Sequence, residues 1–388
     1  MRLAPPYQKL RALAIALSAF SAAIGQSVAA PYIQTNLVSD LPGLAAITDP
    51  ELKNSWGVSE SSISPFWISN QGTSTSTLYT VTGSTNISKV NINPPSGFVA
   101  IPPTGVGPQG PTGQVNNSNA ASFMVGHGGD GGSAHFIFAN LNGTISAWDK
   151  GATAFIQATT SNAVYTGLAI NAAQTRLYAA NDAGTGSINV FNSAFAQLSL
   201  PGAFIDPHLP TGFVPFNVQD IGGNVYVTYA PAGRPNMTGA TAGMGIVDVF
   251  DENGAFLQTL IPLGNHLAAP WGIALAPAGF GAFGGDLLVG NFSFVDSEIN
   301  AFNASTGMFE GTIPINIGSN TPGGLWALTF GNGSSGGATN TLYFADGINS
   351  EGDGLFGAIN VPEPSGLVLF GGALVLLGAL RVGSRRRA

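Results

Sequence analysis

A unit of about 50 residues recurs along this chain and limits the folds open to it more than any other feature. Its clearest part is a short apolar run that usually ends in Asn or Asp. Six copies of the run occur, at residues 66–70, 136–140, 176–181, 225–229, 286–291 and 341–346, and the fourth ends in Tyr instead. Such units pack side by side, because one unit alone cannot bury its apolar face.

Each copy combines this run with further runs that have the character of β-strands. They alternate apolar and polar residues, are rich in β-branched and aromatic side chains, and are separated by Gly, Asn and Ser. First runs include Trp56-Gly57-Val58 and Trp271-Gly272-Ile273, and we assign Phe123-Met124-Val125 as the first run of the second copy. A fourth run is visible in most copies, for example at 255–260.

The spacing of the first runs is regular. Trp271 and Trp326 stand 55 residues apart, and Trp56 precedes Thr166 by 110, which is two periods. Four strands at this spacing are typical of propeller blades. We therefore predict an all-β fold, a six-bladed β-propeller over residues 31–361. A β-helix or a two-domain sandwich is the alternative, although four strands per period fit neither well.

Two segments depart from the repeat. The last copy ends with its third strand at 355–360, so we predict that residues 32–37 supply the outer strand of the last blade and close the ring. Residues 91–119 are rich in Pro and Gly, and we predict a surface loop between the first two blades there.

The N-terminal segment has the features of an export signal. Arg2, Lys9 and Arg11 precede the apolar stretch 13–24, and Val28-Ala29-Ala30 supplies small residues for a peptidase. This pattern predicts a signal peptide over residues 1–30, cleaved after Ala30. A buried N-terminal helix is the alternative.

The C-terminal segment combines three ordered elements. Pro362, Glu363 and Pro364 are followed by 15 uncharged residues at 366–380 and then by Arg385, Arg386 and Arg387. A spanning helix needs about 20 apolar residues, so this one is short, and the arginines would hold its far end on the cytoplasmic side.

These three elements resemble the PEP-CTERM sorting signal, here residues 362–388. The resemblance implies an exosortase as a partner and a transient membrane anchor through the C-terminal helix before processing. A plain membrane anchor is the alternative. The two ends together predict an exported protein of the cell envelope, the cell surface or the extracellular space.

Charge excludes one class of partner. Three of the 12 Lys and Arg lie in the predicted signal and four in the predicted tail, which leaves five basic against 20 acidic residues, a formal charge of −15. So acidic a surface cannot neutralise phosphates, and we expect no nucleic acid partner. It could attract cations or cationic matrix components, or simply keep the protein soluble. The absence of Cys excludes disulfides and thiolate sites.

Polar residues at equivalent repeat positions are the main candidates for a site. In a propeller the second strands end on the face where the chain approaches the first strands, so these side chains should surround one mouth of the central channel. The residues that end second strands are Asn70, Asn140, Asn181, Asn291 and Asp346. His208 and His266, with Asn54 and Asn320, precede first strands and should reach the same face.

Oxygen ligands around an axis suit a calcium ion. The arrangement is similar to that of six-bladed lactonases and gluconolactonases, which implies a calcium-dependent hydrolase with its site at this mouth. The chain departs from that pattern because only Asp346 in the ring carries a charge. The alternative is that these amides cap strand ends and bind the backbone of the following turns.

Two further groups of residues could bind a ligand. His127, Asp130 and His135 lie in a Gly-rich segment and could bind a transition metal, although we expect the glycines to make the segment flexible and the segment to lie away from that mouth. Trp56, Trp271 and Trp326 occupy equivalent positions, which favours packing between blades, with stacking on a sugar as the alternative.

The chain also resembles, over residues 31–361, an uncharacterised family of exported six-bladed propellers that often carry the same tail. We expect a binding or structural module rather than an enzyme. Exopolysaccharide or other matrix components are the expected partners, because proteins with such tails are usually associated with them. A calcium-dependent, lactonase-like hydrolase is the alternative.

Overall fold

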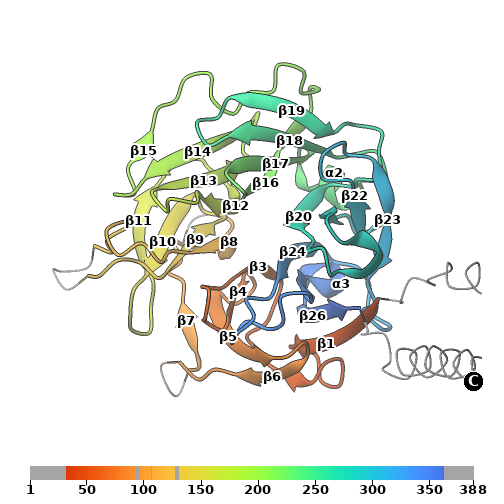
Figure 1. Cartoon of the computed structure of the whole chain (residues 1–388). Helices are drawn as coiled ribbons and strands as arrows, with labels where there is room; N and C mark the ends of the chain where they lie inside the picture. Colours follow the sequence, from red (N-terminus) through yellow and green to blue (C-terminus); the bar gives the residue numbers. More distant parts are fainter. Residues whose placement is uncertain (1–31, 93–95, 106, 127–130, 362–388) are drawn as a thin grey trace, which may run out of the picture. The chain divides into compact units, whose positions relative to one another are not determined.

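Six small, mainly antiparallel sheets follow one another around a ring in the computed structural model (Figure 1). The structure describes residues 32–361 except 93–95, 106 and 127–130. The prediction of a six-bladed β-propeller is confirmed. The expected signal peptide and sorting tail, including Pro362–Pro364 and Arg385–Arg387, lie outside the described residues.

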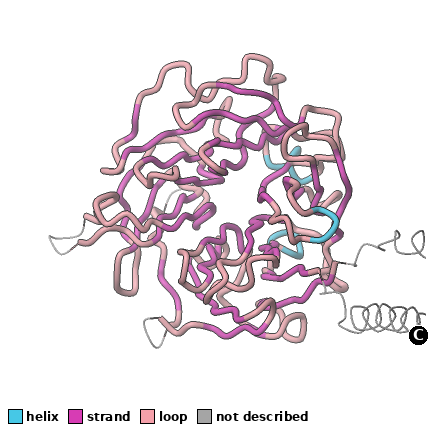
Figure 2. Tube along the Cα trace, in the orientation of Figure 1, coloured by secondary structure: helices cyan, strands magenta, loops and turns pink. Residues whose placement is uncertain are grey.

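Each sheet is a blade whose first strand lies innermost, as the nested strands of Figure 2 show. Blade 1 contains β3 (Ser55–Ser59), β4 (Phe66–Asn70), β5 (Thr75–Thr82), β6 (Asn86–Lys89) and β7 (Phe98–Ala100). Blade 2 contains β8 (Pro111–Asn116), β9 (Phe136–Asn140), β10 (Thr144–Trp148) and β11 (Phe155–Thr159). Blade 3 contains β12 (Tyr165–Ile170), β13 (Arg176–Asn181), β14 (Ser187–Asn192) and β15 (Gln197–Leu198). Blades 4 and 5 contain β16 (Phe213–Ile221), β17 (Asn224–Pro231), β18 (Ile246–Asp251) and β19 (Phe256–Ile261); and β20 (Pro270–Leu275), β21 (Leu287–Asn291), β22 (Glu298–Phe302) and β23 (Phe309–Pro314).

The sixth blade joins the two ends of the propeller. It contains β24 (Leu325–Phe330), β25 (Leu342–Asp346), β26 (Leu355–Asn360), β1 (Ile33–Ser39) and the short β2 (Ile47–Thr48). Strand β1 runs antiparallel to β26, from the pair Ile33–Asn360 to the pair Ser39–Leu355. The predicted closure is confirmed, and its physical effect is to cover the edge of β26 that the chain would otherwise leave unpaired.

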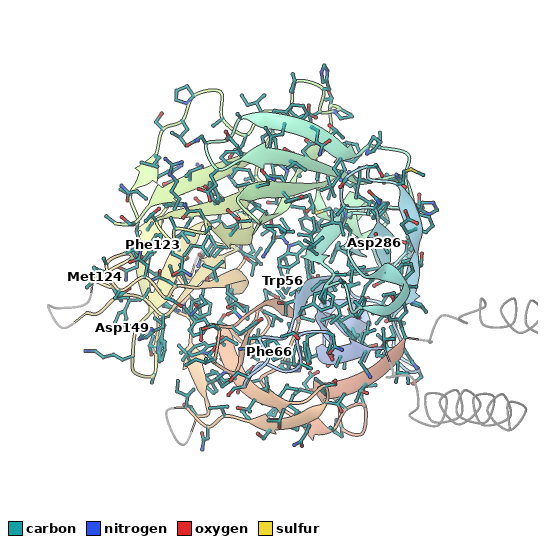
Figure 3. The ribbon with its side chains drawn as sticks, in the orientation of Figure 1. Trp56, Phe66, Phe123, Met124, Asp149 and Asp286 are labelled. Carbon is teal, nitrogen blue, oxygen red and sulfur yellow. The ribbon has the colours of Figure 1, made fainter. Side chains whose placement is uncertain are left out.

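The predicted loop at 91–119 is wrong in part, because it contains two strands. Strand β7 pairs with β5, and β8 is the innermost strand of blade 2, a place that we had assigned to 123–125. Phe123 instead lies at the periphery of the ring, 5.1 Å from Phe195 between ring centroids, whereas Trp56 lies beside the centre (Figure 3). The Pro- and Gly-rich composition hid β8, since this strand starts at a proline and carries a glycine.

All six innermost strands carry a register shift at the equivalent position, for instance between Ser55 and Val58 in β3 and between Leu325 and Leu328 in β24. Bulges of this kind bend a strand and redirect its side chains. Glycine allows the close approach: a Cβ at Gly57 would collide with the Thr112 carbonyl, and a Cβ at Gly113 with the Leu168 amide.

Large aromatic side chains fill the axis that the six inner strands surround. Trp56 and Trp326 stack with ring centroids 3.5 Å apart, and Trp271 meets both edge-on at 6.2 and 5.6 Å. Phe216 and Phe292 pack around Trp326, and we call these five residues the tryptophan plug. All five are buried, so the predicted packing role of the tryptophans matches their position in the structure.

Only short helices occur in the described part of the chain: α2 (Arg234–Thr238), α3 (Ile348–Glu351) and a 3-10 turn at Gly281–Phe283. No helix among the described residues is long and apolar enough to cross a membrane.

The pairing of β1 with β26 can be tested by a disulfide, because the natural chain has no Cys to interfere. We expect Ile33→Cys with Asn360→Cys to oxidise readily, since paired residues of antiparallel strands lie within disulfide reach. Non-reducing electrophoresis and the melting temperature report the bond. Ile33→Cys with Asn192→Cys on blade 3 is the matched control. Equal oxidation of both pairs, or of neither, would contradict the closure.

Candidate functional site

A cavity of about 390 Å³ opens above the tryptophan plug, and we call it the mouth pocket. Gln71, Leu141 and Asp182 each follow directly on the second strand of blades 1, 2 and 3 and line it. The other lining residues are Asn54, Trp56, Pro108, Val164, Thr166, Phe216, Arg234 and Glu351. The pocket therefore lies at the channel mouth where second strands end, with an aromatic floor and polar walls.

An ion pair between distant blades forms one wall. The Arg234 guanidinium, in the loop between β17 and β18, pairs with the Glu351 carboxylate, in the loop between β25 and β26. It also lies over the Phe292 ring, 4.5 Å from the centroid, which adds a cation–π contact. Burial raises the pKa of Glu351, and the charge of Arg234 lowers it in part.

Asn54 connects this wall to the plug. Its Nδ2 donates to Gln71 Oε1 at 2.8 Å and to Glu351 Oε1 at 3.3 Å, while its Oδ1 accepts from Trp326 Nε1 at 3.1 Å. Asn54 has a φ of 44°, a conformation that Asn tolerates better than most residues. The polar wall is therefore held in place before any ligand arrives.

Two groups of the pocket have no partner among the described residues. Trp56 Nε1 is a buried donor without an acceptor, whereas Trp271 Nε1 donates to the Thr166 carbonyl at 2.9 Å. The half-buried Asp182 carboxylate makes no hydrogen bond to another residue in the described part of the chain. Burial raises its pKa to about 6, although the charge of Arg234 lowers it in part. The pocket thus offers an acceptor in the Asp182 carboxylate, whereas the unpartnered Trp56 Nε1 is closed off from solvent.

The ring amides make hydrogen bonds within their own blades or adjoining turns, although Asn70 Oδ1 and Asn140 Oδ1 are buried without a partner in the described part of the chain. Asn70 Nδ2 donates to Thr75 and Thr77 at 3.0 Å, and Asn140 Nδ2 donates to Thr144 and Ser146 on its own blade. The remaining two amides bind backbone: Asn181 Oδ1 accepts from Val164 and Ala183, and Asn291 Oδ1 accepts from Ala268. These contacts are those of strand and turn caps.

Asp346 is buried at the end of β25, and its Oδ1 has no hydrogen-bond partner. Burial alone raises its pKa to about 8. Without a cation beside it, this carboxyl group is therefore mostly protonated at neutral pH.

The candidate histidines lie apart from the mouth pocket. His208 is exposed, and its backbone amide donates to Asp206 Oδ1 at 2.8 Å. His266 stacks on Phe309 of the outer strand β23, with centroids 3.6 Å apart. His135 lines another cavity, while His127 and Asp130 lie outside the described residues. Where the structure describes the chain, no three His, Cys, Asp or Glu side chains gather as a metal site would require.

Sequence reasoning missed Arg234, Glu351, Asp182 and Gln71. Gln71 and Asp182 immediately follow the ring residues Asn70 and Asn181, so the prediction selected the neighbouring position. Arg234 is one of only five basic residues between the predicted signal and tail, and that rarity was an available signal.

The state of Asp346 predicts a dependence of stability on pH. Between about pH 4 and pH 8 the unfolded chain ionises this group while the folded chain keeps it protonated, so the free energy of unfolding falls as pH rises. Asp346→Asn should remove part of that fall, on the order of 1–3 kcal/mol between about pH 5 and pH 9 in urea denaturation. Exposed Glu310→Gln is the control. An unchanged slope in Asp346→Asn would contradict the assignment.

Calcium at the ring stays a prediction of the sequence. Asp346 is the only charged residue of the ring, and no three His, Cys, Asp or Glu side chains gather in the described part of the chain, so we expect chelation to leave the melting temperature of the protein unchanged within about 1 °C. Differential scanning calorimetry with added calcium and with EDTA checks this. A clear drop on chelation, with one tightly held ion, would restore the metal hypothesis.

No model of a known protein family matches the chain. Two curated relatives are uncharacterised proteins of Acanthamoeba polyphaga mimivirus. R648 is 31% identical over 288 residues, which cover 69% of this chain and 66% of R648. L690 is 29% identical over 289 residues, which cover 71% of this chain and 72% of L690. The chain thus spans slightly less than two thirds of the length of R648.

Among solved structures, a protein of unknown function from Bacteroides thetaiotaomicron aligns with a TM-score of 0.50 and 9% identity, over 85% of this chain and 76% of its own. This likeness shows the fold alone. A gluconolactonase from Xanthomonas campestris aligns with a TM-score of 0.36 and 17% identity, over 58% of this chain and 82% of its own, which is too distant to bear on activity.

Proposed function

We propose that this propeller is an exported binding module of the cell surface or extracellular matrix, and that its mouth pocket takes a sugar unit of a polysaccharide. The observation that carries the proposal is the Asp182 carboxylate, a half-buried acceptor without a hydrogen bond to another described residue, in a pocket lined by amides and apolar side chains. The hydroxyl group of a sugar supplies the donor that this carboxylate lacks.

The remaining lining supports the same chemistry. Pro108, Leu141 and Val164 offer an apolar surface against which the C–H face of a sugar ring can pack, above the buried Trp56 and Phe216. Gln71 and Arg234 place an amide and a guanidinium group at the rim, where they can bind further hydroxyls. The network through Asn54 fixes this rim, which lowers the entropy that binding must overcome.

Export and sorting belong to the proposal through the chain ends, which lie outside the described residues. The N-terminal signal and the PEP-CTERM-like tail support passage through a membrane, recognition by an exosortase and a final place at the cell surface or in the matrix. Exopolysaccharide is abundant in that setting, and a neutral or cationic chain would meet less repulsion from an acidic protein than an anionic one.

A calcium-dependent lactonase needs several oxygen ligands that face one ion. Asn70, Asn140 and Asp346 each have a buried Oδ1 without a partner in the described part of the chain. However, Asp346 is the only charged residue of the ring, and the Oδ1 atoms of Asn181 and Asn291 already accept from backbone amides, so we do not propose that activity.

The proposal predicts that Asp182→Asn weakens sugar binding. Replacing the carboxylate by an amide changes a strong acceptor into a weaker one, and we expect a loss of affinity of about tenfold or more. Isothermal titration calorimetry with neutral, amino and acidic oligosaccharides measures it. Affinity for the wild type should also fall below about pH 6, where the carboxylate takes up a proton.

Asp296→Asn is the matched control, because Asp296 lies in a loop on the mouth face but does not line the pocket. Equal affinity of the two variants at every pH, or no binding of any oligosaccharide by the wild type, would refute the proposed site.

A further inference from the structure

A second cavity lies over the seam between blades 1 and 2, with a volume of about 590 Å³, and we call it the seam groove. Its lining includes Ile63 from the segment between β3 and β4, Asn116 from the end of β8 and His135 directly before β9. The mouth pocket is lined from the opposite ends of the same antiparallel strands, by Asn54 before β3 and Gln71 after β4. The groove and the pocket therefore open on opposite faces of the ring.

Stacked aromatic rings form the floor of the groove. Trp67 stacks on Phe136 with centroids 4.0 Å apart and 18° between the ring planes, and Trp148 lies 4.8 Å from Trp67. Trp67 and Phe136 are buried, whereas Trp148 is half-buried. Trp148 Nε1 donates to the Gly151 carbonyl at 2.8 Å, so the indole is fixed by its edge while part of its surface faces the groove.

The polar lining is uncharged in character. Serine hydroxyls, the amides of Asn116 and Asn117 and the imidazole of His135 surround the floor, and no Asp, Glu, Lys or Arg is among the described residues that line the groove. This contrasts with a body whose acidic residues greatly outnumber its basic ones. Ile63, which is 72% exposed, extends the apolar surface at the rim.

From this lining we infer that the seam groove binds a neutral saccharide chain. Sugar rings present C–H groups on their faces and hydroxyls at their edges, which matches an aromatic floor inside a rim of hydroxyls and amides. No Asp, Glu, Lys or Arg among the described lining residues supplies a counter-charge, which disfavours a strongly charged occupant. The fixed orientation of Trp148 makes the floor preorganised.

This site goes beyond the mouth pocket, since its evidence lies on the other face. A protein that can bind one sugar unit at the mouth and a saccharide chain along the seam can hold two polysaccharide strands together.

The test is Trp148→Ala, measured by affinity gel electrophoresis of the full-length protein in soluble neutral polysaccharides such as a β-glucan, a galactomannan and starch. We expect at least one of them to retard the wild type and Trp148→Ala to lose about tenfold in affinity. Trp148→Phe, which keeps an aromatic face, should retain most of it. Leu257→Ala, at a residue 51% exposed on β19, is the control for loss of an exposed apolar side chain.

The same substitution in an Asp182→Asn background separates the two sites. We expect the effect of Trp148→Ala to persist in that background. A mouth pocket that binds no sugar would therefore not contradict saccharide binding at the seam groove, and a seam groove that binds none would not contradict sugar binding at the mouth pocket. Unchanged retardation of a folded Trp148→Ala protein would overturn the inference, as would a wild type that no neutral polysaccharide retards. Capture of a protein partner in a manner that depends on Trp148, without saccharide binding, would also overturn it.

Discussion

The filling of the central axis by Trp56, Trp271 and Trp326 is the contact on which the rest of the structure depends. Six inner strands arranged in a ring leave a space that backbone alone cannot fill, and an unfilled space forfeits dispersion contacts on every side. The indoles occupy it, and bulges on all six inner strands redirect side chains at that level. The plug lies between the mouth pocket and a smaller cavity of about 50 Å³ that is lined in part by Trp271. The mouth pocket therefore ends at the plug and does not continue along the axis as an open channel.

Buried acids without cationic partners are the second physical theme. Burial raises the pKa of Glu60 and of Asp346 to about 8, and that of Asp248 to about 7, with a further rise from nearby Asp206. None of the three has a cationic partner among the described residues, so the folded chain holds Glu60 and Asp346 mostly as neutral acids at neutral pH. The formal charge of the body therefore overstates its negative charge at neutral pH.

Much of the fold could be predicted because the repeat consists of local sequence patterns: alternating apolar and polar residues, turn residues between them, and a nearly constant spacing. The closing strand followed from counting, since the last copy lacked one strand. Strand β8 was not predicted because Pro111 and Gly113 are residue types typical of loops. One repeat of 55 residues after Trp56 nevertheless ends at residue 111, next to Thr112. The mouth pocket was harder to predict, because Arg234 and Glu351 are 117 positions apart and meet only when the ring closes. The ring amides were selected for their identity, yet only side-chain direction decides whether such residues face the axis or their own blade.

A crystal structure of the protein with a bound oligosaccharide would test the central claim most directly. The account predicts a sugar ring in the mouth pocket above Trp56, with a hydroxyl group within hydrogen-bond distance of the Asp182 carboxylate. An oligosaccharide bound elsewhere, with the mouth pocket holding only solvent while Trp56 and Asp182 keep their present positions, would contradict it.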